Sequence, residues 1–447
     1  MRIALPPSIP SLQCMIGKPV VLPVPMNIDP SRFGRLLAST SGIEILMDDL
    51  GRAMAGAGGS LRMLGGGNPA HIPEIEQVWR RRMAEILADG DCFERMLGNY
   101  DPPRGNARFL DSLAGLLRRE FGWDISADNL AVTSGGQTAF FYLFNLLAGE
   151  MPRGKAKKIL LPVVPEYIGY ANQGACPGIF TARHPRLGFP APHQFKYGVD
   201  FDNLNISDEI AAVCVSRPTN PTGNVLTDAE VARLAAICRD RSIPLILDNA
   251  YGMPFPHIIF SQATPYWDVN TILTLSLSKL GLPGTRTGVV VAKPEIARAV
   301  QSLTAVTGLA NGNIGQTIVE PLIASGEILR LSREVIQPFY RAKAAHALQC
   351  VDTFFADEMD YYVHANEGAL FLWLWFKDLP ITSKQFYERL KKRGVLVVPG
   401  EYFFFGLDDP DWAHSRECLR VSFAMGDEDV RAGLKIIAEE ALKAYGA

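Results

Sequence analysis

Short apolar runs rich in β-branched residues alternate with helix-type patterns through the middle of the chain. This alternation constrains the fold more than any other feature of the sequence. It predicts an α/β fold in which a mainly parallel sheet is sandwiched by helices. The predicted strands cover residues 130–133, 158–161, 211–215, 244–247 and 271–274, and each is followed by a turn with polar or glycine residues.

One helix between these strands is well marked by its first residues. Thr227 and Glu230 have the spacing of a capping box, and the apolar face behind them consists of Val231, Leu234, Ala235 and Cys238. In open parallel sheets, ligands bind outside the carboxyl ends of the strands. The residues that follow the predicted strands are therefore the first candidates for a site.

The C-terminal part has a different pattern, which indicates a smaller α+β domain. Strand-like residues 369–375 and 395–398 enclose helix-like residues 384–393, and a last helix is expected near 427–444. The predicted division is an N-terminal arm (1–34), an N-terminal part of the small domain (35–75), a large cofactor-binding domain (76–325) and a small C-terminal domain (326–447).

Composition narrows the class of ligand. The chain has 447 residues, of which 48% are apolar and 20% charged, and its net charge of −3 comes with no basic stripe, so nucleic acid is not an expected partner. The longest apolar run, residues 139–148, is too short to cross a bilayer. Seven scattered cysteines lack metal-site spacing and predict reduced thiols in a cytoplasmic protein. We expect a small-molecule ligand and no metal.

One lysine, Lys279, lies among hydroxyls, glycines and an arginine in residues 276–288. A lysine can form an imine with pyridoxal phosphate, and the guanidinium of Arg286 can hold a phosphate through two parallel hydrogen bonds. The segment therefore indicates a pyridoxal phosphate site with Lys279 as the Schiff-base residue. The competing interpretation is a solvated loop, because a lysine beside serines is a weak motif by itself.

Three segments after predicted strands carry further candidates. The Gly135-Gly136 turn opens an apolar helix whose free amides favour a phosphate, although a plain turn would have the same sequence. In residues 216–223, two prolines stiffen a loop from which Asn220 can reach a ring hydroxyl. Asp248 is suited to hold a protonated pyridine nitrogen, with a helix N-cap as the alternative, and Tyr251 can reach the ring hydroxyl.

Two more residues complete the set of candidates. Tyr167, in residues 165–170, can stack on a pyridine ring or belong to the core. Arg420 lies inside an apolar strand, where an arginine needs an anion, so it is the candidate for a substrate carboxylate. A structural salt bridge would explain Arg420 equally well. The cluster at 402–405 would line the substrate pocket or pack between domains.

These motifs occur in the order and rough spacing of the fold-type I pyridoxal phosphate aminotransferases, and the chain resembles that superfamily from about residue 35 to the C-terminus. Residues 64–70, 165–170, 214–224, 248–255, 276–284 and 367–382 are similar to its bacterial branch that acts on valine and pyruvate. One departure concerns the interval from Lys279 to Arg286, which is seven residues where many members have eight.

The resemblance implies a role for each matching residue. Lys279 would form the Schiff base and shuttle the proton, Asp248 would bind the ring nitrogen, and Tyr167 would cover the ring face. Asn220 and Tyr251 would bind the ring hydroxyl, and Arg420, Gly67 and Asn220 the substrate carboxylate. The residues implied for the phosphate are Gly136, Gln137, Ser276, Ser278 and Arg286, with Tyr100 reaching over from the other subunit of a homodimer.

The activity implied is transamination in two half-reactions, from L-valine and pyruvate to 3-methyl-2-oxobutanoate and L-alanine. The partners would be amino acids and 2-oxo acids. One alternative is an alanine or aromatic aminotransferase that uses 2-oxoglutarate. Another is a non-catalytic regulator, which would need a DNA-binding domain; residues 1–34 are too short and too rich in proline to form one.

Overall fold

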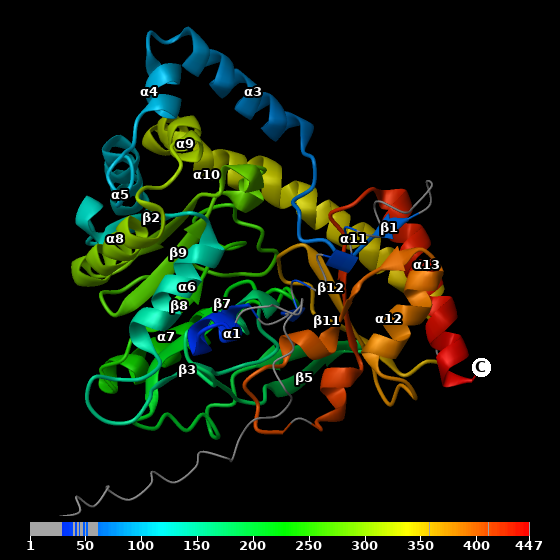
Figure 1. Cartoon of the computed structure of the whole chain (residues 1–447). Coiled ribbons are helices and arrows are strands. Elements are labelled where there is room, and N and C mark those ends of the chain that lie inside the picture. Colours follow the sequence, from blue (N-terminus) through cyan, green and yellow to red (C-terminus); the bar gives the residue numbers. More distant parts are fainter. Residues whose placement is uncertain are drawn as a thin grey trace, which may run out of the picture.

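The fold is built on a seven-stranded sheet (Figure 1), seen in a computed structural model that describes residues 29–446 except 39–40, 43, 45–47, 50, 52–60, 357 and 410. Most of the predicted N-terminal arm therefore lies outside the described residues. In sheet order the strands are β2 (Leu130–Thr133), β10 (Gly288–Val291), β9 (Thr271–Ser276), β8 (Leu245–Asp248), β7 (Ile210–Ser216), β3 (Lys158–Leu161) and β4 (Phe180–Ala182). All five predicted strands are confirmed to within two residues at each end.

Alternation of side chains along the strands explains why helices cover both faces of this sheet. In β8, Leu245 and Leu247 belong to one hydrophobic cluster and Ile246 belongs to another. The first cluster includes apolar residues of α5 (Ala107–Phe121) and α7 (Asp228–Asp240), and the second those of α6 (Gly136–Leu147) and α8 (Pro294–Gly308). A strand that is buried on both faces reads as a continuous apolar run, which is the pattern found in the sequence.

Strand β10 is the antiparallel strand of this mainly parallel sheet. It runs antiparallel to both β2 and β9, whereas the other strand pairs of this sheet are parallel. The chain reverses between β9 and β10 within residues 277–287, without a crossover helix. This short return carries Lys279 and Arg286, and so places both at the carboxyl end of β9.

A second sheet of six strands contains segments from two distant parts of the sequence. Its order is β14 (Val398–Pro399), β15 (Cys418–Ser422), β12 (Phe371–Phe376), β11 (Tyr361–His364), β6 (Gln194–Gly198) and β5 (Arg186–Ala191). The hairpin of β5 and β6 comes from within residues 76–325, yet β6 pairs with β11. The proposed domain boundaries stay a prediction, and this hairpin is a connection that they did not include.

The remaining elements surround the two sheets. Beyond α5–α8, the described helices are α1 (Arg32–Leu37), α3 (Pro73–Ala88), α4 (Cys92–Gly98), α9 (Ile314–Ser325), α10 (Glu327–Leu331), α11 (Gln337–Phe354), α12 (Ser383–Lys392) and α13 (Asp427–Tyr445). Strand β1 (Arg62–Met63) pairs with β13 (Val395–Leu396). Helix α11 extends from the side of the larger sheet to α13 beside the smaller one (Figure 1).

Two searches of the described residues concern membrane spans and metal sites. No described helix is long and apolar enough to span a membrane. The described residues also contain no group of three histidine, cysteine or carboxylate side chains with the placement of a metal site.

The capping box at the start of α7 is present as predicted and provides a test of the local folding argument. Thr227 Oγ1 accepts a hydrogen bond from the Glu230 amide at 3.2 Å, and the Glu230 carboxylate accepts from the Thr227 amide at 2.9 Å. Thr227→Ala should lower the free energy of unfolding by about 1 kcal/mol, measured by urea denaturation. Ser302→Ala, which removes a hydroxyl from an exposed position inside α8, should change it by less than about 0.5 kcal/mol. Equal losses in the two variants would contradict the capping argument.

Candidate functional site

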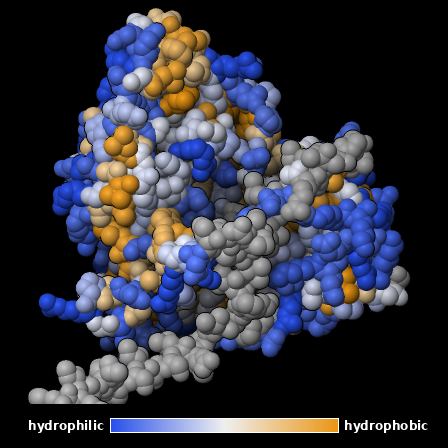
Figure 2. All heavy atoms as spheres, in the orientation of Figure 1, coloured by the Kyte–Doolittle hydropathy of each residue, from blue (hydrophilic) through white to orange (hydrophobic). Residues whose placement is uncertain are grey.

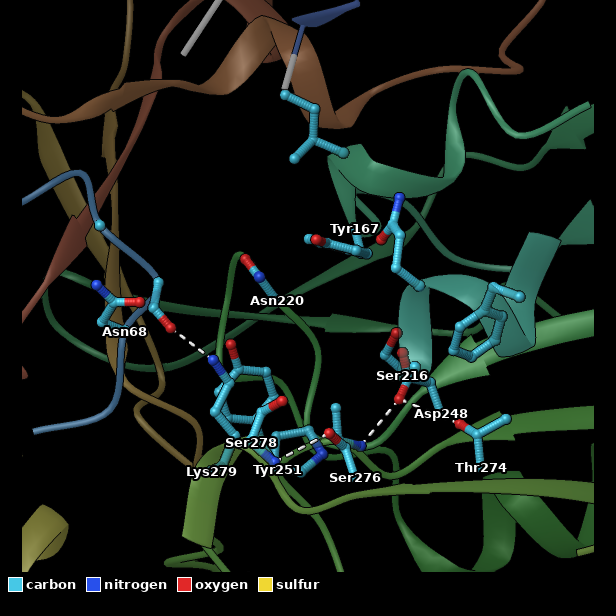
Figure 3. Close-up of a pocket in the computed structure, with 18 of the residues that line it drawn as sticks. Asn68, Tyr167, Ser216, Asn220, Asp248, Tyr251, Thr274, Ser276, Ser278 and Lys279 are labelled. Carbon is cyan, nitrogen blue, oxygen red and sulfur yellow. Dashed lines mark hydrogen bonds between the residues drawn. The ribbon is translucent and has the colours of Figure 1, made fainter. Parts of the chain in front are cut away.

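The carboxyl ends of the central strands open into a cavity of about 400 Å³. Every predicted site residue except Tyr100 lines this cavity (Figure 3). The residues concerned are Gly67, Gly136, Gln137, Tyr167, Asn220, Asp248, Tyr251, Ser276, Ser278, Lys279, Arg286 and Arg420. Segments that lie far apart in the sequence are thus brought to one edge of the sheet, as expected for this architecture.

Lys279 lies in a 3₁₀ turn directly after β9, inside the cavity and not in a solvated loop. Its Nζ atom donates to the carbonyl oxygen of Gly67 at 2.5 Å and lies 5.1 Å from the centre of the Tyr251 ring. Burial, followed by the charges of Arg420 and Arg286, lowers the pKa of Lys279 to about 8. About a tenth of the amine is therefore neutral, and nucleophilic, at pH 7.

Asp248 is the last residue of β8 and is 8% exposed. Its carboxylate accepts from the Ala250 amide at 2.8 Å, from Thr274 Oγ1 at 3.4 Å and from the Tyr170 hydroxyl. No helix begins at this position, so the alternative of a helix N-cap is wrong. Burial raises the pKa of Asp248, against the lowering effect of these donors. A nearby cation would stabilise the ionised carboxylate.

One end of the cavity has the features of a phosphate site. It is formed by the first turn of α6, the hydroxyls of Ser276 and Ser278, and the guanidinium of Arg286. Gly135, with φ +90°, allows the guanidinium to lie over this turn, because a Cβ there would be 2.4 Å from Arg286 Nη2. Free helix amides and a guanidinium together favour a dianion. The interval of seven residues from Lys279 therefore still brings Arg286 to the cavity.

Arg420 lies on β15 and is 3% exposed. Its Nη1 donates to Asn220 Oδ1 at 2.7 Å, its Nη2 donates to the carbonyl of Gly65 at 2.7 Å, and its buried Nε has no partner. No ion pair links Arg420 to a carboxylate among the described residues, so a structural salt bridge does not explain its burial. Burial lowers its pKa to about 10. A buried guanidinium with an unused donor favours an anionic ligand.

The two aromatic candidates border the cavity on different sides. The Tyr167 ring packs over Gly169, where a Cβ would come within 2.3 Å of its Cε1 atom. The Tyr251 ring lies beside the Lys279 amine, and burial raises the pKa of its hydroxyl. Figure 3 shows Tyr167 at a distance from Lys279 and Tyr251, with Asn220 between them in this view. A flat ring bound there would have aromatic and polar neighbours.

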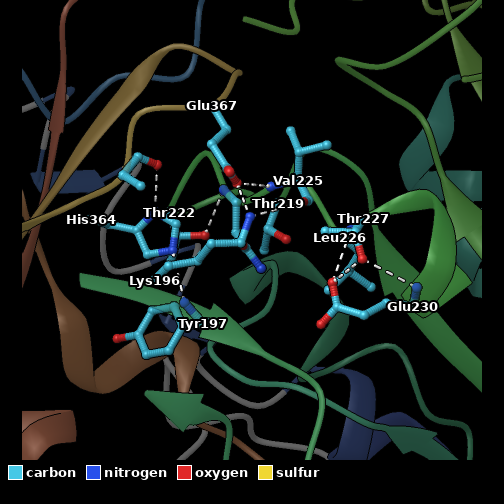
Figure 4. A network of polar contacts seen from close by, with 12 residues as sticks. Lys196, Tyr197, Thr219, Thr222, Val225, Leu226, Thr227, Glu230, His364 and Glu367 are labelled. Carbon is cyan, nitrogen blue, oxygen red and sulfur yellow. Dashed lines mark hydrogen bonds and ion pairs between the residues drawn. The ribbon is translucent and has the colours of Figure 1, made fainter. Parts of the chain in front are cut away.

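The loop that carries Asn220 is held by an ion pair from the smaller sheet (Figure 4). Lys196 on β6 forms this pair with Glu367, and the same carboxylate accepts from the Val225 amide at 3.0 Å. Lys196 Nζ also donates to the Val225 carbonyl at 3.0 Å. The ion pair thus satisfies both backbone groups of Val225, and it fixes the end of the loop on which Asn220 meets Arg420.

Several residues in or behind the cavity were missed from sequence. Ser216, Met63 and Asn68 line the cavity, and Tyr170 lies behind Asp248, to which its hydroxyl donates. Tyr170 is in the quoted 165–170 motif, and its spacing of three residues from Tyr167 was the available signal. Residues 402–405 do not line the cavity. Phe403 is fully buried and packs against Trp373, so of the two possibilities for this cluster the structure favours packing over lining the substrate pocket.

The fold and this site define an aminotransferase, and the family model described as aminotransferase class I and II matches residues 76–437. The chain belongs to this family, which confirms the expected fold, transamination chemistry and dependence on pyridoxal phosphate. The chain is similar to the valine–pyruvate aminotransferase of Escherichia coli K12, with 46% identity over 93% of this chain and 98% of the relative.

Two solved structures are similar over nearly their whole lengths. A putative amino-acid aminotransferase from Psychrobacter arcticum 273-4 has 43% identity and a TM-score of 0.90, and the match covers 94% of this chain and 99% of that one. The valine–pyruvate aminotransferase of Salmonella typhimurium LT2 has 45% identity and a TM-score of 0.83, with coverage of 91% and 100%.

The lowered pKa of Lys279 makes the loading of the cofactor-free protein dependent on pH. Only the neutral amine attacks an aldehyde, so the loading rate should rise as pH rises through about 8 and then level off. Stopped-flow absorbance after mixing with pyridoxal phosphate would measure this rate. In Lys279→Ala, which has no amine at this position, the absorbance change of imine formation should be absent. A rate that keeps rising up to pH 10 would show that the amine has its ordinary pKa.

Proposed function

We propose that this protein transfers the amino group of L-valine to pyruvate and produces 3-methyl-2-oxobutanoate and L-alanine. The observation that carries the proposal is the 46% identity to a valine–pyruvate aminotransferase over almost the entire length of both chains. Three properties of the residues that line the cavity support it: their fit to the cofactor, the number of cationic side chains among them, and the position of a base.

The residues around the cavity fit pyridoxal phosphate, and we propose the following roles for them. The first turn of α6 with Gly136 and Gln137, the hydroxyls of Ser276 and Ser278, and Arg286 hold the phosphate. Asp248 binds the ring nitrogen, Asn220 and Tyr251 the ring hydroxyl, and Tyr167 one face of the ring. When bound, the cofactor supplies a reactive carbonyl carbon and an electron-withdrawing ring. The orphaned Nε of Arg420 remains for the substrate.

Lys279 is the proposed proton carrier. Its amine lies in the cavity between the Gly67 carbonyl and the Tyr251 ring. Because its pKa is lowered to about 8, the amine can accept a proton from the substrate's α-carbon and release it again near neutral pH. Arg420 orients the substrate by holding its carboxylate with the paired donors that a planar guanidinium offers.

The number of cations supports a substrate with one carboxylate. The positively charged side chains among the described residues of the lining are Lys279, Arg286 and Arg420. With Arg286 on the phosphate and Arg420 on the α-carboxylate, the described part of the lining offers no third cation for the distal carboxylate of 2-oxoglutarate. The rest of the described lining includes the apolar residues Met63, Phe140 and Ile168. Valine, alanine and pyruvate match this lining better than a dicarboxylic acid does.

Absorbance spectroscopy of the loaded enzyme tests the proposal. L-valine should abolish the visible band of the bound cofactor, and pyruvate should restore it. We expect 2-oxoglutarate to have a kcat/KM on the order of 100-fold lower than pyruvate, because an unpaired carboxylate in the cavity costs about 3 kcal/mol. Loss of the band with L-glutamate but not with L-valine would instead favour the alternative acceptor, and Lys279→Ala serves as the control without turnover.

We propose further that the enzyme works as a homodimer in the cytoplasm, with Tyr100 completing the phosphate site of the partner subunit. Tyr100 is 83% exposed and is not part of the lining of this chain's own cavity. It follows α4, where Leu97 is 54% exposed, and Leu87 at the end of α3 is 61% exposed. Hydrophobic residues gather at this end of the molecule (Figure 2), as on a surface that a partner covers.

The free cysteines support a reducing location.

Subunit mixing tests the role of Tyr100. In a hybrid of a Lys279→Ala chain and a Tyr100→Phe chain, the proposal puts both defects in one site and leaves the other site native. Co-expression of the two differently tagged variants should therefore yield hybrids with about half the wild-type activity per dimer. If Tyr100 acted within its own chain, the hybrid would be no more active than the Tyr100→Phe homodimer alone, and light scattering would show whether dimers form at all.

A further inference from the structure

A second buried carboxyl group, Glu166, lies behind Asp248 and takes no part in the proposed chemistry. It precedes Tyr167 in the segment after β3 and is 0% exposed. Its Oε1 atom accepts from the Ser216 amide at 2.8 Å, and its Oε2 atom lies 2.6 Å from Ser216 Oγ and 3.2 Å from the Tyr167 amide. No ion pair joins it to a cation among the described residues.

A series of hydroxyls connects Glu166 to Asp248. Ser216 Oγ lies 3.4 Å from the Tyr170 hydroxyl, and the Tyr170 hydroxyl donates to Asp248. Ser216 and Asp248 are also paired in the register of β7 and β8. The sheet therefore fixes Ser216 and Asp248 relative to each other, and Ser216, Tyr170 and Glu166 are all nearly or fully buried.

Each hydroxyl in the series has one proton to donate, which links the protonation of the two carboxyl groups. If Glu166 carries a proton, it can donate to Ser216, Ser216 to Tyr170, and Tyr170 to Asp248, so that every contact has a donor. If Glu166 is ionised, the Ser216 hydroxyl must donate to it. The Tyr170 hydroxyl already donates to Asp248, so no proton is left for a hydrogen bond between Ser216 and Tyr170. Two unscreened carboxylates would then also share one apolar region.

The surroundings of the two carboxyl groups differ. Asp248 borders the cavity, where the charge of Lys279 lowers its pKa and where a cofactor ring would supply a positive charge. The titratable groups that face Glu166 are Asp248, Tyr167, Tyr170 and Cys214, none of which is a cation. Burial raises the pKa of Glu166 to about 8, in agreement with this geometry.

We propose that Glu166 is held as a neutral carboxylic acid and acts as a positioning residue that orients the Ser216 and Tyr170 hydroxyls toward Asp248. The negative charge of the pair then resides on Asp248, at the cavity. The inference rests on the proposed role of Asp248 at the cofactor ring, but the protonation of Glu166 can be measured in the protein without cofactor. The two ideas can therefore fail independently.

The first experiment uses the stability of the cofactor-free protein. A carboxyl group that keeps its proton in the folded state but loses it on unfolding makes stability fall as pH rises from 4.5 to about 8. Glu166→Gln has no such proton, so its stability relative to wild type should increase over this range. Glu440, which is 8% exposed and paired with Arg393 and Lys443, has a lowered pKa. Glu440→Gln should therefore lose stability relative to wild type as pH rises to about 4.5, and the difference should then stay constant up to about pH 8.

Infrared and visible spectra provide the remaining readouts. A protonated carboxyl band in the wild-type protein at pH 6.5 should be absent from Glu166→Gln. In the loaded enzyme, Glu166→Gln should keep the wild-type pH titration of the cofactor's visible band, because the amide still donates to Ser216. Glu166→Leu and Tyr170→Phe interrupt the series and should shift the titration midpoint by about one pH unit.

Three results would overturn the proposal: parallel stability profiles of Glu166→Gln and wild type, an unchanged carboxyl band, or a titration shift as large in Glu166→Gln as in Glu166→Leu. If Glu166→Leu does not fold, the stability profile and the infrared band of Glu166→Gln decide. If L-valine fails to abolish the visible band while the Glu166 measurements agree with expectation, the proposed substrate is wrong and the assignment of Glu166 stands.

Discussion

The buried guanidinium of Arg420 is the constraint on which the arrangement of the site depends. Arg420 has no ion partner among the described residues, so neutral groups from two other parts of the chain satisfy its donors. Asn220 belongs to the loop after β7 of the larger sheet, and Gly65 belongs to the glycine-rich segment before α3. Phe371 and Phe403 cover the guanidinium, with ring centres 4.3 and 5.3 Å away. One cation therefore joins both sheets and the N-terminal segment at the edge of the cavity.

The same constraint explains the role of the outer polar contacts. Asn220 can meet Arg420 only if its loop is fixed, and the ion pair of Lys196 and Glu367 fixes it through Val225. The ion pair is partly buried, so its attraction is screened less than that of a surface pair. On the opposite side, Glu166 and Ser216 fix the start of the loop and the backbone of Tyr167. Polar contacts outside the cavity therefore hold both ends of the loop that carries Asn220.

Local pattern was sufficient to predict the central strands and most of the site, because the carboxyl ends of parallel strands converge. β-branched runs predicted β2, β3, β7, β8 and β9, and the residues after them met at the cavity as expected. Strand β10 was missed although Val289, Val290 and Val291 form a β-branched run, and the sequence contains no signal for its antiparallel direction. The place of β6 in the smaller sheet was missed because its partner β11 lies more than 150 residues away in the sequence, and β5 contains a glycine and a proline that weaken its strand pattern. The positions of Ser216 and Glu166 behind Asp248 depend on tertiary contacts for which a single sequence contains no signal, and Tyr170 was indicated only by its spacing of three residues from Tyr167.

The membership of β5 and β6 in the C-terminal sheet also has a consequence for the order in which the chain can fold. β6 finds its partner β11 only after residue 361 has been made, and β12 and β15 complete that sheet at residue 422. Until then, the hairpin has an open strand edge next to a sheet that can already form, and open edges invite pairing with other chains. The late C-terminal strands therefore protect the earlier hairpin from association, in addition to supplying Arg420 to the site. A chain that stops before them would lack both the carboxylate-binding residue and the cover for this edge.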